Sequence, residues 1–132
     1  MEKTIKIPSK IESLREIEKL IDDIAAENKL TSEVYGNVLI ASLEAVNNAI
    51  MHGNKQDNSK DVDVAFILET TKLKVMVRDQ GPGFDFTNIP DPTAPENLEN
   101  INGRGIFLMQ KLSDNISFSE EGKVVELIFN IK

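Results

Sequence analysis

Two polar side chains that could act together, Glu44 and Asn48, stand four positions apart in a stretch of helical periodicity. Residues with this spacing share one face of a helix, about one turn apart. An amide oxygen is a hard ligand suited to Mg²⁺, and a nearby carboxylate can act as a general base. An isolated pair of this kind is usually an exposed polar face. Here the apolar neighbours Ala45, Val46 and Ile50 predict a largely buried helix, in which the polar pair needs a role.

A second motif, Asp79-Gln-Gly81-Pro-Gly83, follows a strand-like run. An ionised carboxylate at a strand end can accept a hydrogen bond from the exocyclic amine of adenine, and glycines let the backbone approach a ring. A plain turn is the alternative interpretation, because Asp, Gly and Pro are common turn residues.

A third motif, Gly103-Arg104-Gly105, precedes a helical run that starts at Ile106. Free amides at a helix N-terminus bind anions, and Arg104 could add positive charge beside phosphates. The motif is neither a Walker sequence, which continues Gly-Lys-Ser/Thr, nor a Rossmann fingerprint, which needs a preceding strand and a third glycine. The single histidine, His52, is interpreted as a cap on helix-terminal carbonyls in preference to a phosphoacceptor or metal ligand.

The elements that position these motifs are predicted from periodicity and capping signals. Ser9, with Glu12 three residues later, is expected to cap an amphipathic helix that ends near Asn28, and Thr31 or Ser32 to cap a second helix that ends with a left-handed Gly53. Strands are expected over residues 4–7, 61–69, 72–78, 116–118 and 124–131, and a third helix over 105–112. The hairpins turn at Thr70-Thr71 and at Glu121-Gly122.

Residues 84–102 contain three prolines and little periodicity, so we expect a long loop there, of a kind that is more often functional than accidental. The order of the elements predicts an α+β fold. We expect a two-layer sandwich with helices on one face of a mixed, mostly antiparallel sheet.

Composition limits the classes of function. With 132 residues, 40% of them hydrophobic, we expect one compact domain over residues 1–132. No cysteine is present, which excludes disulfides and thiolate metal sites. A net charge of −7 disfavours nucleic acid as a direct partner, although backbone amides and Mg²⁺ could still hold a nucleotide. No apolar run suits a membrane span or a signal peptide, so we expect a cytoplasmic protein that does not bind a membrane.

The Bergerat-fold (GHKL) ATPases, the superfamily of gyrase, Hsp90, histidine kinases and MutL, carry motifs that three segments of this chain resemble. In order and spacing these are Glu44-Ala-Val-Asn-Asn48-Ala-Ile-Met-His52-Gly53, Asp79-Gln-Gly-Pro-Gly-Phe-Asp85 and Gly103-Arg-Gly-Ile-Phe-Leu-Met109. Within this superfamily the chain looks like the anti-sigma factor serine/threonine kinases, which carry Glu-Ala-x-x-Asn-Ala-x-x-His-Gly in the same place. The resemblance covers nearly the whole chain and implies the Bergerat fold.

The resemblance also implies ATP and Mg²⁺ as cofactors, with Asn48 coordinating Mg²⁺ and Glu44 as the catalytic base that takes a proton from a serine of a partner protein. The implied ATP-binding residues are Asn48, Asp79, Gly81, Gly83, Gly103, Arg104 and Gly105. The implied partner is a small anti-anti-sigma protein of the sulfate-transporter-and-anti-sigma (STAS) type. A sigma factor would compete for the same surface of a homodimer, so that transcription is regulated by partner switching.

Two departures from the family pattern keep other functions open. Relatives place Gly-Thr before the last strand, where the threonine assists adenine binding, whereas here Lys123 follows Gly122. This difference predicts weaker ATP binding and favours, as an alternative, an ATP-gated protein-binding module with little kinase activity. The short segment 84–102 fits the anti-sigma branch better than a third possibility, a detached histidine-kinase catalytic domain.

Overall fold

The computed structural model describes residues 1–81 and 101–131. Its strands are β1 (Glu2–Pro8), β2 (Asp61–Leu68), β3 (Lys72–Arg78), β4 (Asn115–Ser119) and β5 (Val124–Asn130). Its helices are α1 (Leu14–Asn28), α2 (Ser32–Asn48) and α3 (Ile101–Leu112), with short helical turns η1 (Ile11–Ser13), η2 (Ala49–Gly53) and η5 (Glu120–Gly122).

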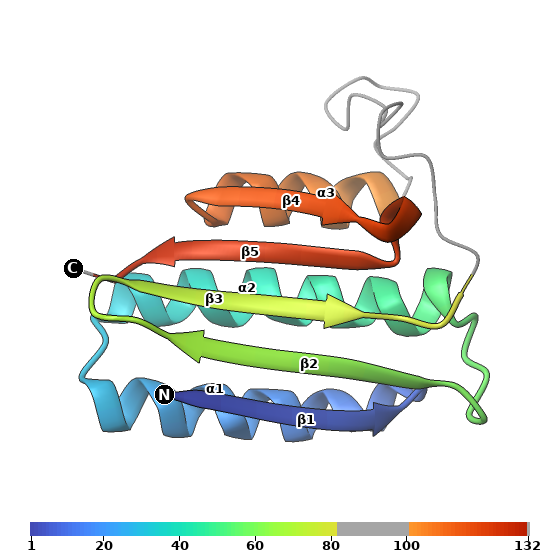
Figure 1. The fold of residues 1–132 in the computed structure, drawn as a ribbon, viewed down its shortest axis with the longest axis horizontal. Helices are drawn as coiled ribbons and strands as arrows, with labels where there is room; N and C mark the ends of the chain where they lie inside the picture. Colours follow the sequence, from blue (N-terminus) through green and yellow to red (C-terminus); the bar gives the residue numbers. More distant parts are fainter. Residues whose placement is uncertain (82–100, 132) are drawn as a thin grey trace.

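The five strands form one sheet in the order β1-β2-β3-β5-β4, and each neighbouring pair is antiparallel. All three helices cover the same face of this sheet, with α2 behind its centre (Figure 1). The α+β sandwich expected from the sequence is therefore confirmed. Within the described ranges, no helix is long and apolar enough to cross a membrane.

Alternation in the strands produces the core. Val62, Val64 and Phe66 of β2 are buried, and the intervening residues of that strand are partly exposed on the opposite face. Val77 of β3 pairs with Val64 on one side and with Val125 of β5 on the other, so the apolar side chains form rows across the sheet. The helices contribute their buried faces to the same cluster: Ile17, Ile21 and Ile24 from α1, Val38, Ala41, Ala45 and Val46 from α2, and Ile106 and Met109 from α3.

One of the two expected helix caps is confirmed. The Thr31 side chain accepts a hydrogen bond from the Val34 amide at 3.2 Å. The capping box at Ser9 is wrong, because Ser9 is fully buried and its hydroxyl donates to the Lys60 carbonyl at 2.6 Å. The first helix instead begins with the 3₁₀ turn η1 and continues as α1 from Leu14.

The end of the second helix also differs from expectation. The chain leaves α2 through η2, a wide π-helical turn in which the Asn54 amide donates to the Ala49 carbonyl at 2.8 Å. Gly53 is not left-handed; the positive φ angles fall later, at Lys55 and Gln56. The absence of a Cβ at Gly53 serves a close contact described below.

The third helix starts earlier than expected, at Ile101 rather than Gly105. The expected loop 84–102 lies almost entirely outside the described residues. The β2–β3 hairpin turns where predicted, with the Glu69 amide donating to the Lys72 carbonyl at 2.8 Å. The β4–β5 connection is also as predicted, because Glu120 and Gly122 both adopt positive φ angles around the turn.

Candidate functional site

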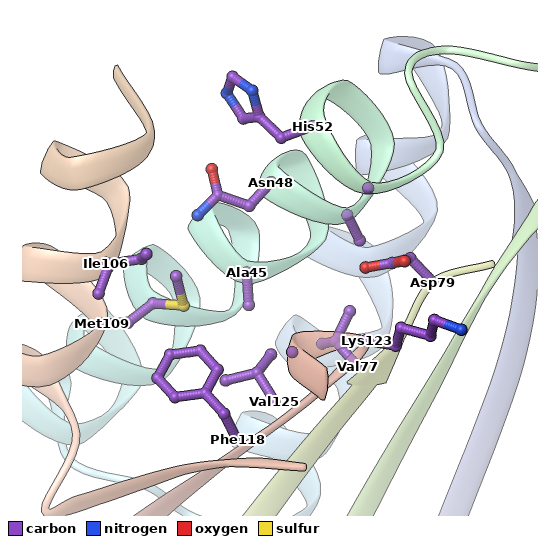
Figure 2. Close-up of a pocket in the computed structure, with 13 residues that line it drawn as sticks. Ala45, Asn48, His52, Val77, Asp79, Ile106, Met109, Phe118, Lys123 and Val125 are labelled. Carbon is purple, nitrogen blue, oxygen red and sulfur yellow. The ribbon is translucent and has the colours of Figure 1, made fainter. Parts of the chain in front are cut away.

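A cavity of about 120 Å³ opens at the end of the molecule where α2 and β3 finish and where β5 and α3 begin. Its walls are mostly apolar: Ala45, Ala49, Val77, Ile106, Met109, Phe118 and Val125. Figure 2 shows polar side chains at two places on its boundary, with Asp79 on one side and Asn48 and His52 on another. An apolar cavity with a few convergent polar groups is typical of a small-molecule site.

Two hydrogen bonds to neighbouring backbone groups hold Asp79, one through its own amide and one through its carboxylate. Its own amide donates to the Lys123 carbonyl at 3.0 Å, which continues the pairing of β3 with β5 beyond the end of the strand. Its Oδ1 accepts a hydrogen bond from the Gly81 amide at 2.8 Å. These two bonds restrict the orientation of the carboxylate at the boundary of the cavity.

Burial raises the pKa of the Asp79 carboxyl above its ordinary value, because a charged group is less stable away from water. Three weaker influences lower the pKa again: the Gly81 amide, the positive charge of Lys123 and that of Lys60. Lys123 lies on the same side of the cavity as Asp79 (Figure 2). The net direction is upward, so Asp79 carries its charge at a cost.

Asn48 and Glu44 come together beneath α3. A Cβ built on Gly105 would lie 3.0 Å from Asn48 Nδ2, 3.2 Å from Asn48 Oδ1 and 3.1 Å from Glu44 Oε2. A side chain at residue 105 would crowd this polar pair, and the neighbouring side chains would have to move by a few tenths of an ångström to accept it. The Oδ1 atom of Asn48 is buried and has no hydrogen-bond partner among the residues that the structure describes. A buried acceptor without a partner is costly, and such an atom suits a ligand that supplies positive charge.

Two glycines allow the Asp79 turn to touch η2. A Cβ on Gly53 would lie 2.4 Å from both Cγ and Oδ2 of Asp79, and a Cβ on Gly81 would lie 1.9 Å from the Gly53 carbonyl oxygen. Both distances are far shorter than any real carbon contact. The two backbone segments therefore interlock, and a side chain at either glycine would push them apart.

The remaining predicted residues fall in different places. Gly103 and Arg104 lie inside the first turns of α3, whereas the sequence predicted them ahead of that helix. Gly83 lies outside the described residues. His52 is exposed at the boundary of the cavity. Lys123, which stands where the family threonine was expected, lines the same cavity.

Sequence reasoning did not identify Asn54. Asn54 is only 1% exposed, and its side chain bonds to three separate segments of the chain. An asparagine directly after a helix-terminal glycine is an ordinary turn signal, and its partners are 7 to 45 residues away in the sequence. No local pattern could have distinguished it.

Comparison with a solved structure supports the fold. The crystal structure of the RsbU and RsbW domains of Rv1364c from Mycobacterium tuberculosis superimposes with a TM-score of 0.71 at 18% sequence identity. The match covers 99% of this chain and 32% of that longer chain, so this protein corresponds to about a third of it.

Proteins named serine-protein kinase RsbW are similar over most of their length. The Bacillus cereus protein is 30% identical over 128 residues, covering 92% of this chain and 79% of that protein. The Staphylococcus aureus protein is 26% identical over 136 residues, with 97% and 86% coverage. The Oceanobacillus iheyensis protein is 24% identical over 123 residues, with 89% and 78% coverage.

The family model described as histidine kinase-like ATPase domain matches residues 7–129, which include the whole cavity and both sides of the Asp79 turn. The resemblance noted in the sequence is thereby confirmed. The chain belongs to the histidine kinase-like ATPase domain family, on the branch of the RsbW serine-protein kinases.

Proposed function

We propose that this chain is an ATP- and Mg²⁺-dependent serine/threonine kinase of the anti-sigma type, with residues 1–132 forming one catalytic domain. The observation that carries the proposal is that one apolar cavity is lined both by a half-buried carboxylate, Asp79, and by Asn48, whose buried side-chain oxygen has no hydrogen-bond partner within the described ranges. The first can read a base and the second can serve the phosphate end of the same nucleotide.

Asp79 would bind the adenine. Its ionised carboxylate would accept a hydrogen bond from the exocyclic amine, while Val77, Met109 and the other apolar walls pack against the ring. Gly81 and Gly83 would keep the adjoining backbone clear of the base. Lys123 has no threonine hydroxyl to add, so Asp79 is the main polar contact in this half of the cavity.

Asn48 would hold Mg²⁺ together with the nucleotide phosphates. The fit is supported by its buried, unpaired Oδ1, a hard oxygen of the type that this ion prefers. No cluster of three or more His, Cys, Asp or Glu side chains suited to a metal occurs in the described part of the chain, so the phosphates would complete the coordination. When bound, Mg²⁺ neutralises negative charge on the transferred phosphoryl group. Gly103, Arg104 and Gly105, in the first turns of α3, would contact the phosphates.

Glu44 would act as the catalytic base. As the serine hydroxyl oxygen of the partner bonds to the γ-phosphorus and ADP departs, the hydroxyl proton passes to the Glu44 carboxylate. Its nearness to Asn48 beneath Gly105 supports this role, because the base must lie beside the phosphate end of the nucleotide.

The substrate in this proposal is a small STAS-type anti-anti-sigma protein, and a sigma factor is the competing partner of a cytoplasmic homodimer. The homodimer should sediment with about twice the 14.7 kDa mass of the chain. Regulation would then follow from which partner is bound, since one surface serves both.

The decisive experiment is transfer of labelled phosphate from ATP to a matched anti-anti-sigma protein. We expect label on a serine with the wild type, and loss of transfer with retained ATP binding in Glu44→Gln. Asp79→Asn should lose ATP affinity itself. Transfer that persists in Glu44→Gln would remove the catalytic assignment.

A second candidate, an ATP-gated binding module, is favoured by Lys123 beside Asp79 in place of the family threonine. In that case partner binding measured by calorimetry would depend on ATP and survive Glu44→Gln, with no labelled product. A detached histidine-kinase catalytic domain would instead place acid-labile phosphate on a histidine of a separate protein.

A further inference from the structure

The turn that carries Asp79 is fastened to the rest of the molecule by one buried side chain. Asn54 follows the π-helical turn η2 and is almost completely buried, although it is an uncharged polar residue with two donors and two acceptor positions. A buried carboxamide is stable only where these groups are paired. Asn54 is paired on both sides of its amide group.

The oxygen of the Asn54 side chain points to the base-reading turn. Oδ1 accepts a hydrogen bond from the Gln80 amide at 2.7 Å, and Gln80 is the residue between Asp79 and Gly81. The Gln80 side chain strengthens the same attachment, because its Oε1 accepts from the Asp61 amide at 2.6 Å. Gln80, the residue next to Asp79, is therefore held through both its backbone amide and its side chain.

The nitrogen of the same side chain points to the ends of two strands. Nδ2 donates to the Ser9 hydroxyl at 2.8 Å and to the Asp61 carbonyl at 3.0 Å. Ser9 in turn donates to the Lys60 carbonyl at 2.6 Å. One carboxamide thus joins the residue after β1, the first residue of β2 and the residues after β3.

We propose that Asn54 is a positioning residue that sets where the Asp79 carboxylate stands in the base pocket. This inference rests on the proposed function, in which Asp79 reads the exocyclic amine of adenine. The interlocked glycines leave no free space between η2 and the Asp79 turn. A small shift of η2 relative to this turn is therefore enough to displace the Asp79 carboxylate. Loss of the Asn54 oxygen frees the Gln80 amide from η2 and lets the carboxylate move with it.

The competing explanation is that Asn54 only stabilises the fold. The preference for ATP over ITP separates the two, because inosine carries a carbonyl oxygen where adenine carries the amine. A purely structural defect lowers the fraction of folded protein but leaves the ratio of the two dissociation constants unchanged, since both nucleotides bind the same folded molecules. A displaced Asp79 lowers that ratio.

The test measures both dissociation constants by calorimetry in wild type, Asn54→Ala, Asn54→Asp, Asp79→Asn and Thr31→Ala. Thr31→Ala is the matched control, because it removes a helix cap remote from the cavity and destabilises the fold without touching the turn. Asn54→Asp keeps an oxygen for the Gln80 amide, and all variants are measured at the same pH, about 8, well above the ordinary pKa of a carboxyl group.

We expect the ATP/ITP preference to fall on the order of tenfold in Asn54→Ala, to stay at the wild-type value in Thr31→Ala and to be largely retained in Asn54→Asp. If Asn54→Ala does not fold, the Asp variant decides, and an ATP/ITP preference as low as that of Asp79→Asn overturns the proposal. If the ATP/ITP preference of Asn54→Ala equals that of the wild type, the positioning role of Asn54 is overturned but base reading by Asp79 is not. A wild type without any preference for ATP overturns base reading by Asp79, and this proposal with it.

Discussion

At the scale of single residues, Asp79 shows how the site balances burial against charge. A carboxylate that reads an amine must be ionised, yet burial raises its pKa. The Gly81 amide and the cations Lys123 and Lys60 oppose that rise. Lys123 therefore lowers the pKa of Asp79 from a position where the family pattern led us to expect a threonine.

ATP affinity should fall as the pH decreases. The fall should begin at a higher pH than it would if Asp79 had the pKa of an ordinary aspartate. The ionised form of Asp79 accepts the hydrogen bond, and a raised pKa means that protonation begins at higher pH. Lys123→Met removes a positive charge that lowers this pKa, so ATP affinity should be lost at a still higher pH in this variant than in the wild type. Calorimetric titration across the acidic range measures both profiles.

Lys19→Met is the control for the lysine variant, because Lys19 is exposed on α1 and is not among the groups that influence Asp79. Its pH profile should overlay that of the wild type. Overlapping profiles for Lys123→Met and the wild type would contradict the electrostatic role of Lys123.

At the scale of secondary-structure elements, glycines allow the close approach of η2 to the Asp79 turn. Gly81→Ala should lower ATP affinity by at least about tenfold and destabilise the fold by about 1–3 kcal/mol, because its Cβ would overlap the Gly53 carbonyl at 1.9 Å. Gly36→Ala in α2 is the matched control. Apart from its own turn of helix, no atom of the described residues lies within 4 Å of its added Cβ, so it should stabilise the helix by about 0.5–1 kcal/mol. Calorimetry and urea unfolding measure the two effects, and equal behaviour of both variants would refute the interlocking of η2 with the Asp79 turn.

Helix α2 also contains a polar group without a described function. Ser42 is fully buried against the core, and its hydroxyl has no hydrogen-bond partner in the described part of the chain. Ser42→Ala removes this unpaired group and substitutes a better helix former, so the free energy of unfolding should rise by about 1 kcal/mol. Urea unfolding checks the change, with unaltered ATP affinity as the control. A loss of stability would mean that the hydroxyl is paired in solution.

The elements that follow from local pattern were predictable and those that depend on distant partners were not. Alternation in β2 and β3 identifies both strands because one face of the sheet is buried and the other is not. The Thr31 cap was equally predictable, since its partner is three residues away. Ser9 satisfied the same local rule but bonds to Lys60, 51 residues away, and this tertiary contact overrides the capping pattern.

The candidate site was predictable to a similar extent. The motifs named Asn48, Asp79 and Gly105, and the fold brings all three to one end of the molecule. The apolar walls could not be assigned, because Phe118 and Val125 belong to β4 and β5, whose placement against α3 and α2 depends on the whole sheet. Asn54 escaped for the same reason.

At the scale of the whole molecule, the cavity exists only when β3, β5, α2 and α3 are all in place. ATP should therefore bind the folded state alone and stabilise it by mass action. Mg-ATP at about 100 times its dissociation constant should add about 2.7 kcal/mol and raise the melting temperature by about 10 °C. Thermal unfolding measures the shift.

Two variants separate the residue that binds the nucleotide from the residue that acts only in phosphate transfer. Glu44→Gln should keep the thermal shift, because the base acts in transfer rather than in binding. Asp79→Ala should lose most of it. An equal shift in Asp79→Ala and wild type would place the nucleotide elsewhere.

The π-helical turn η2 determines the rotational register between the two halves of the site. Successive residues of an α-helix advance by about 100° around its axis, so a wide turn rotates everything that follows relative to everything before it. Glu44 and Asn48 precede η2, whereas Asn54 follows it. Deleting one residue from the turn would leave every catalytic side chain in the sequence but turn Asn54 away from Gln80. In the proposed site, the placement of Asn48 relative to Asn54 and the Asp79 turn would thus depend on backbone winding as much as on side-chain identity.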